Sequence, residues 1–290
     1  FNREGDQGAV RAEKLAKQCQ ESEDYPVSMR GDKEIRVARV GQSGAEELDR
    51  VAVEEPLQLV VDGHPVAVLM RTPGNDDELA AGFLQTEGIV NSKEQIVRID
   101  LEAKENHALV FLADGVEVDL GRLTRHLFSA SSCGLCGKAS IEAITSLHEP
   151  VPAGPVFQES VLMAAPEALR AAQETFDETG GLHASAVFDR KGKLLVLRED
   201  VGRHNALDKV LGWALLNGRD LSDGFVLMSG RLSFELMQKA LAGRIPLVAG
   251  ISAPSSLAVE FARESNQTLV GFLRPPRFNV YGGIERVEML

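Results

Sequence analysis

The sequence is poor in cysteine and lacks any long apolar run. Its three cysteines among 290 residues are too few, and odd in number, for a disulfide framework, which favours a reducing compartment. No apolar run approaches the roughly 18–20 residues that span a bilayer, so we expect no membrane association. The N-terminal segment 1–26 is polar and lacks the apolar core of a secretory signal. These absences predict a cytoplasmic protein.

The chain has no excess of positive charge and none of the common nucleotide-binding motifs. Its 31 Lys and Arg residues are outnumbered by 43 Asp and Glu residues, which gives a formal net charge of −12. A nucleic-acid-binding surface needs a basic stripe, so we expect no nucleic-acid partner. Neither a Walker A motif nor G-x-G-x-x-G is present, which argues against an ordinary ATPase or NAD enzyme. A small anionic ligand stays compatible, because a few clustered arginines act locally.

The remaining composition is that of a folded protein, with 44% hydrophobic and 26% charged residues. The length suits one large domain or two ordinary ones. We predict a disordered or weakly ordered polar head at residues 1–30, an N-terminal subdomain at 31–150 that includes the C-x-x-C loop, and an α/β domain at 151–290. The segment "PVPAGP" at 150–155 is the best linker in the chain.

Local patterns in the first half predict a β-rich subdomain with one clear helix. The segment 55–72 alternates apolar residues around Asp62-Gly63, which predicts two strands and a turn. Asn75 as N-cap, with Glu78 three residues later, resembles a capping box, and Gly88 marks the end of the helix. Further predicted elements are strands at 95–101 and 107–113 and a helix at 138–147.

The second half alternates strands and helices, which predicts a parallel sheet with helices packed on it. The predicted order is helix 166–178, strands 182–189 and 194–200, helix 205–216, strand 225–230, helix 233–243, strand 246–252, helix 255–265 and strand 268–274. In such sheets, ligands bind beyond the carboxyl ends of the strands. Those ends are "SGR" at 229–231 (Ser229, Gly230, Arg231), "SAPSS" at 252–256 and "RPPR" at 274–277.

Two of these strand ends lead into helix N-termini, where free backbone N–H groups favour an anion. Arg231, Arg274 and Arg277 supply positive charge near the same edge. The pattern therefore predicts a site for a phosphate-bearing ligand. The alternative is structural, with serines that only cap helices and arginines that only line a solvated rim.

The segment "SSCGLCGKAS" at 131–140 places Cys133 and Cys136 in a C-x-x-C spacing. Structural zinc sites need four ligands and commonly use two such pairs, whereas this chain has one pair, with His126 seven residues before it. Zinc deaminases add a glutamate in an H-x-E motif before the pair. Here "HAS" at 183–185 has serine in that place and follows the pair, so we expect no metal.

Two thiol chemistries stay open for Cys133 and Cys136. A redox pair typically lies at a helix start, where the following helix, together with Lys138, would lower a thiol pKa. Sulfur carriage requires an accessible and mobile thiolate that accepts a persulfide sulfur and passes it on, and the serines and glycines here suit such a loop. The spacing alone does not separate the two.

A group of polar residues follows the predicted strand 194–200. It either forms a wall of a ligand pocket or holds the strand-to-helix turn as a structural network. The residues are Asp200, Arg203, His204, Asn205, Asp208 and Lys209. His183 follows Gly180-Gly181, which allows close backbone approach, and either lines the same cavity or is a buried structural histidine.

A series of sequence blocks, in order, resembles the FdhD family, the formate dehydrogenase accessory sulfurtransferases. The blocks extend from about Glu54 to Tyr281 and are far more specific than a lone C-x-x-C. They are "EEPLQLVVDG", "MRTPGNDDELAAGFLQTEGIV", "SSCGLCGK", "TGGLHASAVFD", "LREDVGRHNALDKVLGWAL", "SGRLSFELMQKA", "ISAPSSLAVEFA" and "VGFLRPPRFNVY".

The resemblance implies a sulfur relay. A cysteine desulfurase donates the sulfur, Cys133 carries it as a persulfide with Cys136 as its partner, and formate dehydrogenase is the client. The implied acceptor is the molybdenum cofactor, a bis(molybdopterin guanine dinucleotide). The implied cofactor-binding segment is Phe272, Leu273, Arg274, Pro275, Pro276 and Arg277, with Ser229, Gly230, Arg231, His183 and His204 as further candidates.

The family also implies an α/β/α layering similar to cytidine deaminases, with a smaller N-terminal subdomain and no zinc, and it is compatible with a homodimer. One departure is that members often have glycine after the first arginine of the C-terminal segment. Pro275 and Pro276 stand here instead and remove two N–H donors. The alternative functions are a thiol–disulfide oxidoreductase and a cofactor chaperone that carries no sulfur.

Overall fold

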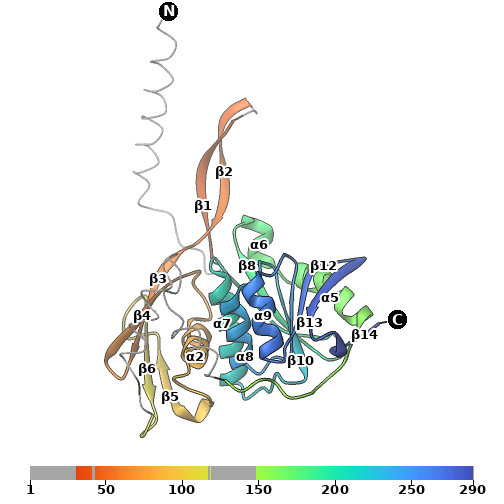
Figure 1. The fold of residues 1–290 in the computed structure, drawn as a ribbon. Helices are drawn as coiled ribbons and strands as arrows, with labels where there is room; N and C mark the ends of the chain where they lie inside the picture. The colour runs from red at the N-terminus through yellow and green to blue at the C-terminus, as the bar shows by residue number, and fades with distance from the viewer. Residues whose placement is uncertain (1–30, 41–42, 117, 119–147, 290) are drawn as a thin grey trace, which may run out of the picture.

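The computed structural model describes residues 31–40, 43–116, 118 and 148–289, and its largest element is a six-stranded sheet (Figure 1). The strand order is β13-β12-β11-β10-β8-β9. Strands β10, β11 and β12 are parallel, as predicted, whereas β8, β9 and β13 run antiparallel to their neighbours, so the sheet is mixed. The bounds are β8 His183–Asp189, β9 Leu194–Asp200, β10 Gly224–Met228, β11 Leu247–Gly250, β12 Thr268–Arg274 and β13 Arg277–Gly282.

Helices cover both faces of this sheet, which gives the predicted α/β/α layering (Figure 1). Of the described helices, three pack on one face and one packs on the other: α7 Arg203–Leu216, α8 Phe234–Ala242 and α9 Ser256–Glu264 lie opposite α5 Glu159–Ala171. Val226 and Val248 point to the α7–α9 side, while their neighbours Phe225 and Leu247 point to α5. Burial on both faces explains why these strands are continuous apolar runs.

A second, four-stranded sheet packs on one helix in the first half of the chain. Its strand order is β4-β3-β6-β5, and β3 and β4 are joined by the predicted turn. Asp62 (φ 46°) and Gly63 (φ 81°) both have the left-handed backbone that such a two-residue turn requires. The bounds are β3 Glu55–Val61, β4 His64–Arg71, α2 Asp76–Thr86, β5 Ile96–Asp100 and β6 His107–Leu112, with a short 3-10 helix, η1, at Lys93–Gln95.

Helices α2 and α7 cross with their backbones in contact. A Cβ atom added to Gly82 would lie 1.8 Å from the carbonyl oxygen of Asp208, and one added to Gly212 would lie 1.8 Å from the carbonyl oxygen of Glu78. Only glycine fits at both positions. The crossing fixes the four-stranded sheet and its helix against the larger sheet, although the division of the chain near residue 150 stays a prediction.

One predicted helix and one predicted capping box are wrong. The expected helix 166–178 is instead the end of α5 followed by a separate α6 (Glu174–Thr179), and Pro166 lies inside α5 rather than at its start. The helix predicted after Asn75 is confirmed as α2, and Asn75 is its N-cap residue, but Asn75 has a left-handed backbone (φ 56°) and its side chain makes no cap hydrogen bond. Glu78 does not complete a capping box, because its Oε1 accepts from Nη2 of Arg198 at 2.6 Å.

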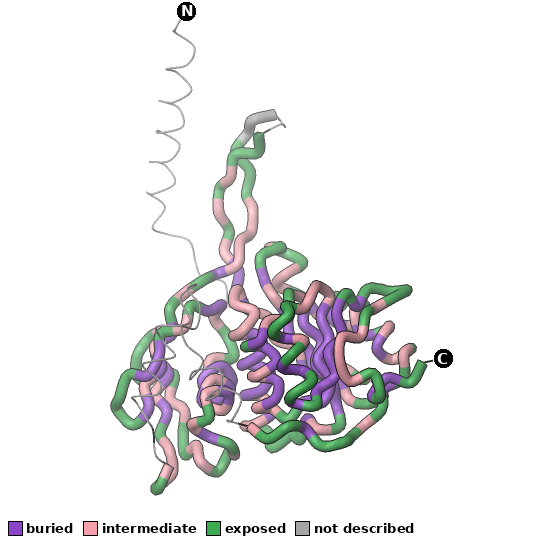
Figure 2. The backbone as a smooth tube through the Cα atoms, viewed as in Figure 1, coloured by how far each residue is buried: buried purple, intermediate pink, exposed green. Residues whose placement is uncertain are grey.

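A hairpin of β1 (Asp32–Val40) and β2 (Ser43–Ala52) was not predicted and stands away from the body of the protein (Figure 1 and Figure 2). Arg50 fixes its base through Asp32, with Nε and Oδ2 2.8 Å apart, and through Glu178 of α6. Near the C-terminus, η2 (Ile284–Arg286) precedes β14 (Val287–Glu288), which pairs with β7 (Phe157–Gln158). No helix within the described ranges is long and apolar enough to cross a membrane. The predicted head at 1–30 and helix at 138–147 lie outside the described residues.

Candidate functional site

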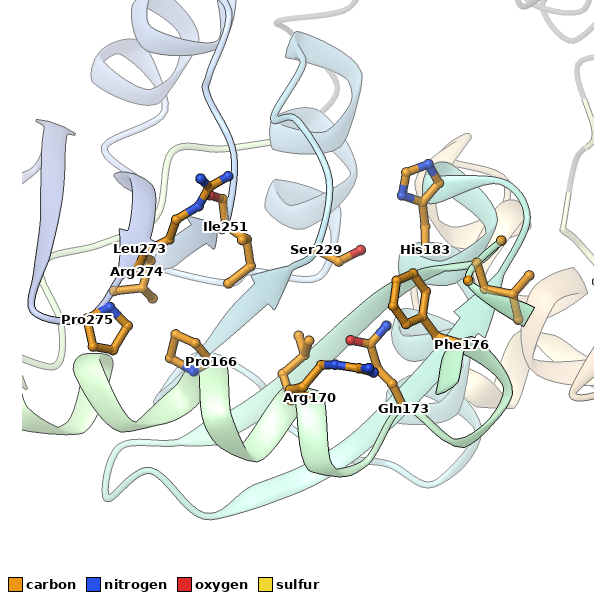
Figure 3. A pocket seen from close by; sticks show the side chains of 14 residues that line it. Pro166, Arg170, Gln173, Phe176, His183, Ser229, Ile251, Leu273, Arg274 and Pro275 are labelled. Atoms are coloured by element: carbon orange, nitrogen blue, oxygen red, sulfur yellow. The ribbon is translucent and has the colours of Figure 1, made fainter. Parts of the chain in front are cut away.

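A cavity of about 660 Å³ lies between helices α5 and α6 and one edge of the six-stranded sheet (Figure 3). This volume is within the usual range for a small-molecule site. Five of the residues predicted to bind a ligand line it, namely His183, Ser229, Leu273, Arg274 and Pro275. The parallel strands β10 and β12 bring their carboxyl ends to this edge, and antiparallel β8 brings its first residue there.

The predicted C-terminal binding segment is irregular at the end of β12. Phe272 has a left-handed backbone (φ 52°) within a register shift between Gly271 and Arg274, which is unusual for a bulky residue. Leu273 points into the core and is fully buried, whereas Phe272 is 40% exposed. Arg274 lines the cavity, where its Nε donates to the carbonyl oxygen of Ile251 at 2.9 Å.

Arg274 and Arg277 are direct partners in the β12–β13 pair, and both are exposed. Neither forms an ion pair with another described residue. Two such guanidinium groups at one turn make a locally positive site, which suits an anionic group despite the net charge of −12. Pro275 and Pro276, joined by a cis peptide bond, offer no N–H groups, so the arginines supply the donors at this turn.

The other predicted binding residues do not line this cavity. They are Gly230, Arg231, His204, Phe272, Pro276 and Arg277. Gly230 packs behind His183, since a Cβ atom added to it would lie 3.3 Å from Nδ1 of His183. Burial, followed by the charges of Arg203 and Arg231, lowers the pKa of His183. His183 therefore presents a neutral imidazole to the cavity at neutral pH.

His204, at the start of α7, is a second neutral histidine. Burial, with added repulsion from Arg203 and Lys239, lowers its pKa to about 4. Its Nε2 atom is buried and has no hydrogen-bond partner among the described residues. His204 therefore adds no positive charge to the end of the sheet where Arg274 and Arg277 lie.

Asp200 and Lys209 form a buried ion pair, with Oδ2 and Nζ 2.7 Å apart. Asp200 also accepts from the backbone N–H of Thr72 (3.1 Å) and of Gly202 (2.8 Å) and from Nδ2 of Asn205 (2.9 Å). These contacts join the segment between β4 and α2 to the start of α7. They favour the structural interpretation for Asp200, Asn205 and Lys209.

Asp208 belongs to a second buried network. Its carboxylate accepts from Oγ1 of Thr86 (3.1 Å) and from Nζ of Lys239 (2.8 Å). The network links α2, α7 and α8 and again favours a structural role. Of the predicted polar group, only Arg203 and His204 lie outside these two networks.

Sequence reasoning missed the wall of the cavity that α5 and α6 contribute. Arg170, Gln173 and Phe176 line it, and the Arg170 guanidinium carbon lies 4.9 Å from the centre of the Phe176 ring. No motif marks these three residues. The only signal nearby is Gly180-Gly181, which directly follows α6 and also lines the cavity.

The predicted catalytic residues Cys133 and Cys136 lie outside the described residues, as does Cys19. Their position relative to the cavity therefore stays a prediction. Within the described part of the chain, no three His, Cys, Asp or Glu side chains gather as a metal site. The expected absence of zinc also stays a prediction.

Comparison with known proteins gives consistent matches over most of the chain. A model of the FdhD/NarQ family matches residues 52–288. The sulfur carrier protein FdhD of Mycolicibacterium paratuberculosis is 48% identical over 250 residues, 82% of this chain and 92% of the relative. The protein of the same name from Streptomyces avermitilis is 47% identical over 253 residues, 83% of this chain and 90% of the relative.

A solved structure shows a similar fold. The crystal structure of a putative formate dehydrogenase accessory protein from Desulfotalea psychrophila matches with a TM-score of 0.71 and 27% sequence identity. The match covers 91% of this chain and all of that one. The mixed α/β architecture described above is therefore shared with it.

Proposed function

The chain belongs to the FdhD/NarQ family, and from this premise we propose that it is a sulfur carrier, a sulfurtransferase that serves formate dehydrogenase. Relatives named sulfur carrier protein, identical at 47–48% of aligned positions, carry the first part of the proposal. The similar structure of a putative formate dehydrogenase accessory protein supports the client.

In the proposed donor step, the Cys133 thiolate attacks the outer sulfur of a persulfide on a cysteine desulfurase. The sulfur–sulfur bond of the donor breaks, the donor cysteine leaves as a thiolate, and Cys133 holds the new persulfide. When the Cys136 thiolate then attacks Sγ of Cys133, the outer sulfur leaves as hydrosulfide and a disulfide forms. This second step needs no further oxidant or reductant and would give Cys136 its role as partner.

We propose the molybdenum cofactor, a bis(molybdopterin guanine dinucleotide), as the acceptor. Its pyrophosphate groups suit Arg274 and Arg277, which have no ion-pair partner among the described residues. The cavity of about 660 Å³ would hold one nucleotide arm of this cofactor rather than the whole of it. The single observation that supports this acceptor is the position of Arg274 and Arg277 at the end of the sheet beside that cavity.

We also propose that the layering is similar to that of cytidine deaminases and that the chain divides into two domains. The donor would be a cysteine desulfurase, and the protein would be a cytoplasmic homodimer. The alternatives are a thiol–disulfide oxidoreductase and a cofactor chaperone without sulfur chemistry. The thiol chemistry and the anion site can be tested separately, because they depend on different residues.

The intact mass of the protein tests the carrier chemistry. We expect incubation with a cysteine desulfurase and cysteine, without reductant, to add one sulfur atom that a thiol removes. Cys133→Ala should gain none, and Cys19→Ala, the matched cysteine control, should behave like the unchanged protein. A loss of two hydrogen atoms that also occurs without the desulfurase and cysteine would instead indicate the oxidoreductase, because the carrier forms the Cys133–Cys136 disulfide only after it has received sulfur.

Maturation of formate dehydrogenase in a strain that lacks the unchanged protein tests the whole relay. Cys133→Ala should abolish maturation because no sulfur is carried. The double variant Arg274→Ala/Arg277→Ala should abolish it because the acceptor is not bound. A Cys133→Ala strain that matures active enzyme would contradict the carrier mechanism and favour the chaperone.

A further inference from the structure

Gln173 is a buried polar residue whose amide nitrogen makes no hydrogen bond to any described residue. Its side chain is 3% exposed and lines the cavity, and Nε2 has no hydrogen-bond partner among the described residues. A buried amide nitrogen without a partner is costly and uncommon in folded proteins. Such a group calls for a ligand that completes its hydrogen bonds.

The position of Gln173 in the chain makes this lack of a partner more informative. Gln173 directly precedes α6, where a polar side chain usually caps the free N–H groups of the helix. Its side chain makes no such bond. Glu199 of β9 takes that place, because its Oε2 and Oε1 accept from the N–H groups of Thr175 and Phe176, each at 2.9 Å. The Gln173 side chain, which belongs to a residue that lines the cavity, is thereby left without a bond to the helix.

The surroundings of Gln173 suit a flat ring. Phe176, an aromatic residue that can stack on a ring, lies beside it in the cavity wall, with Leu169 and Leu182 as apolar neighbours in the lining (Figure 3). Figure 3 also shows Arg274 at the opposite end of the cavity from Gln173. The Gln173 end therefore combines the amide and apolar side chains with Arg170, whose guanidinium lies over the Phe176 ring, while Arg274 is the cation of the other end.

We propose that Gln173 recognises the edge of a heterocycle in the acceptor while Arg274 holds the phosphates of the acceptor. This inference rests on the proposed function. The amide N–H donates to a ring carbonyl oxygen, and the amide oxygen accepts from the adjacent ring N–H. Guanine and pterin share this 2-amino-4-oxopyrimidine edge, and the proposed acceptor contains both. Gln173 is therefore assigned as a specificity-determining residue.

Calorimetric titration with GDP, neopterin and inorganic pyrophosphate tests the assignment. Gln173→Met should weaken binding of one heterocycle by roughly 30-fold, the loss expected for two hydrogen bonds, and should leave pyrophosphate binding unchanged. Weakened GDP binding would identify guanine as the ring, and weakened neopterin binding would identify the pterin. Gln158→Met is the matched control, since Gln158 is exposed, directly precedes α5 and likewise makes no side-chain cap.

A second readout separates recognition from packing. Because Gln173→Met removes a buried amide nitrogen that has no partner among the described residues, the ligand-free variant should unfold at the same or a higher temperature than the unchanged protein. Gln173→Leu, also apolar and of similar size, repeats the test should the first variant fail to fold. Unchanged affinity for both heterocycles would overturn the assignment of Gln173 alone. A failure of the unchanged protein to bind any of the three probes would overturn the proposed acceptor site as well.

Discussion

Gly82 of α2 and Gly212 of α7 face each other at the helix crossing, where a Cβ atom added to Gly212 would lie 2.7 Å from the backbone nitrogen of Gly82. The atoms in the way are backbone atoms, which cannot move aside as a flexible side chain can. We expect Gly212→Ala to lower the free energy of unfolding by about 3 kcal/mol or more. Urea denaturation measures this loss.

Gly154→Ala is the control for that substitution. The nearest atom to an added Cβ there is the carbonyl oxygen of Pro152, 3.7 Å away, so the free energy of unfolding should change by less than about 0.5 kcal/mol. Equal losses in the two variants would show that α2 and α7 do not depend on their close approach.

The buried pair of Asp200 and Lys209 gives a second prediction. Lys209→Met leaves the Asp200 carboxylate buried without its counter-charge, and we expect a loss of about 3–5 kcal/mol. The double variant Asp200→Asn/Lys209→Met should lose less than the sum of the two single variants, because neither charge is then left alone. Lys191→Met, at an exposed lysine, serves as the control. If the loss in the double variant equalled the sum of the two single losses, Asp200 and Lys209 would not be coupled.

His204 makes the stability of the fold depend on pH. Its pKa is about 4 in the folded protein and 6.5 ordinarily, so between these values the unfolded chain binds a proton that the folded chain does not. Stability is therefore lost as the pH falls through this window, by about 2 kcal/mol from pH 7 to pH 5. Unfolding in urea at both pH values measures it.

In His204→Gln this share of the pH dependence should disappear, because a glutamine side chain does not titrate. His64→Gln, at an exposed histidine on β4, should keep the full dependence. The prediction fails if the loss between pH 7 and pH 5 is the same in His204→Gln as in the unchanged protein.

Much of the second half was predictable because its strands are buried on both faces. Phe225 to Met228 and Leu247 to Gly250 read as short apolar runs, and helices follow them with clear ends. The site edge followed from the same pattern, since strand ends at Ser229 and Arg274 must meet where parallel strands end.

Features that depend on distant contacts were not predictable. The hairpin β1–β2 has no core, so its strands carry mixed charges in place of an apolar pattern. The N-terminal end of α6 depends on Glu199, which is 24 residues from Thr175 in sequence. No local pattern therefore revealed that Gln173 would face a cavity, or that Glu78 would pair with Arg198, 120 residues away.

The protruding β1–β2 hairpin protects its backbone amides only weakly from hydrogen exchange. A two-stranded hairpin without a core is marginally stable alone, and among the described residues Arg50 fixes its base through Asp32 and Glu178. Further out, the exposed pairs Arg36–Glu46 and Arg39–Glu47 add little and are screened by salt. Hydrogen exchange should therefore quicken steadily from Asp32 towards Val40, and the gradient should steepen as the ionic strength rises.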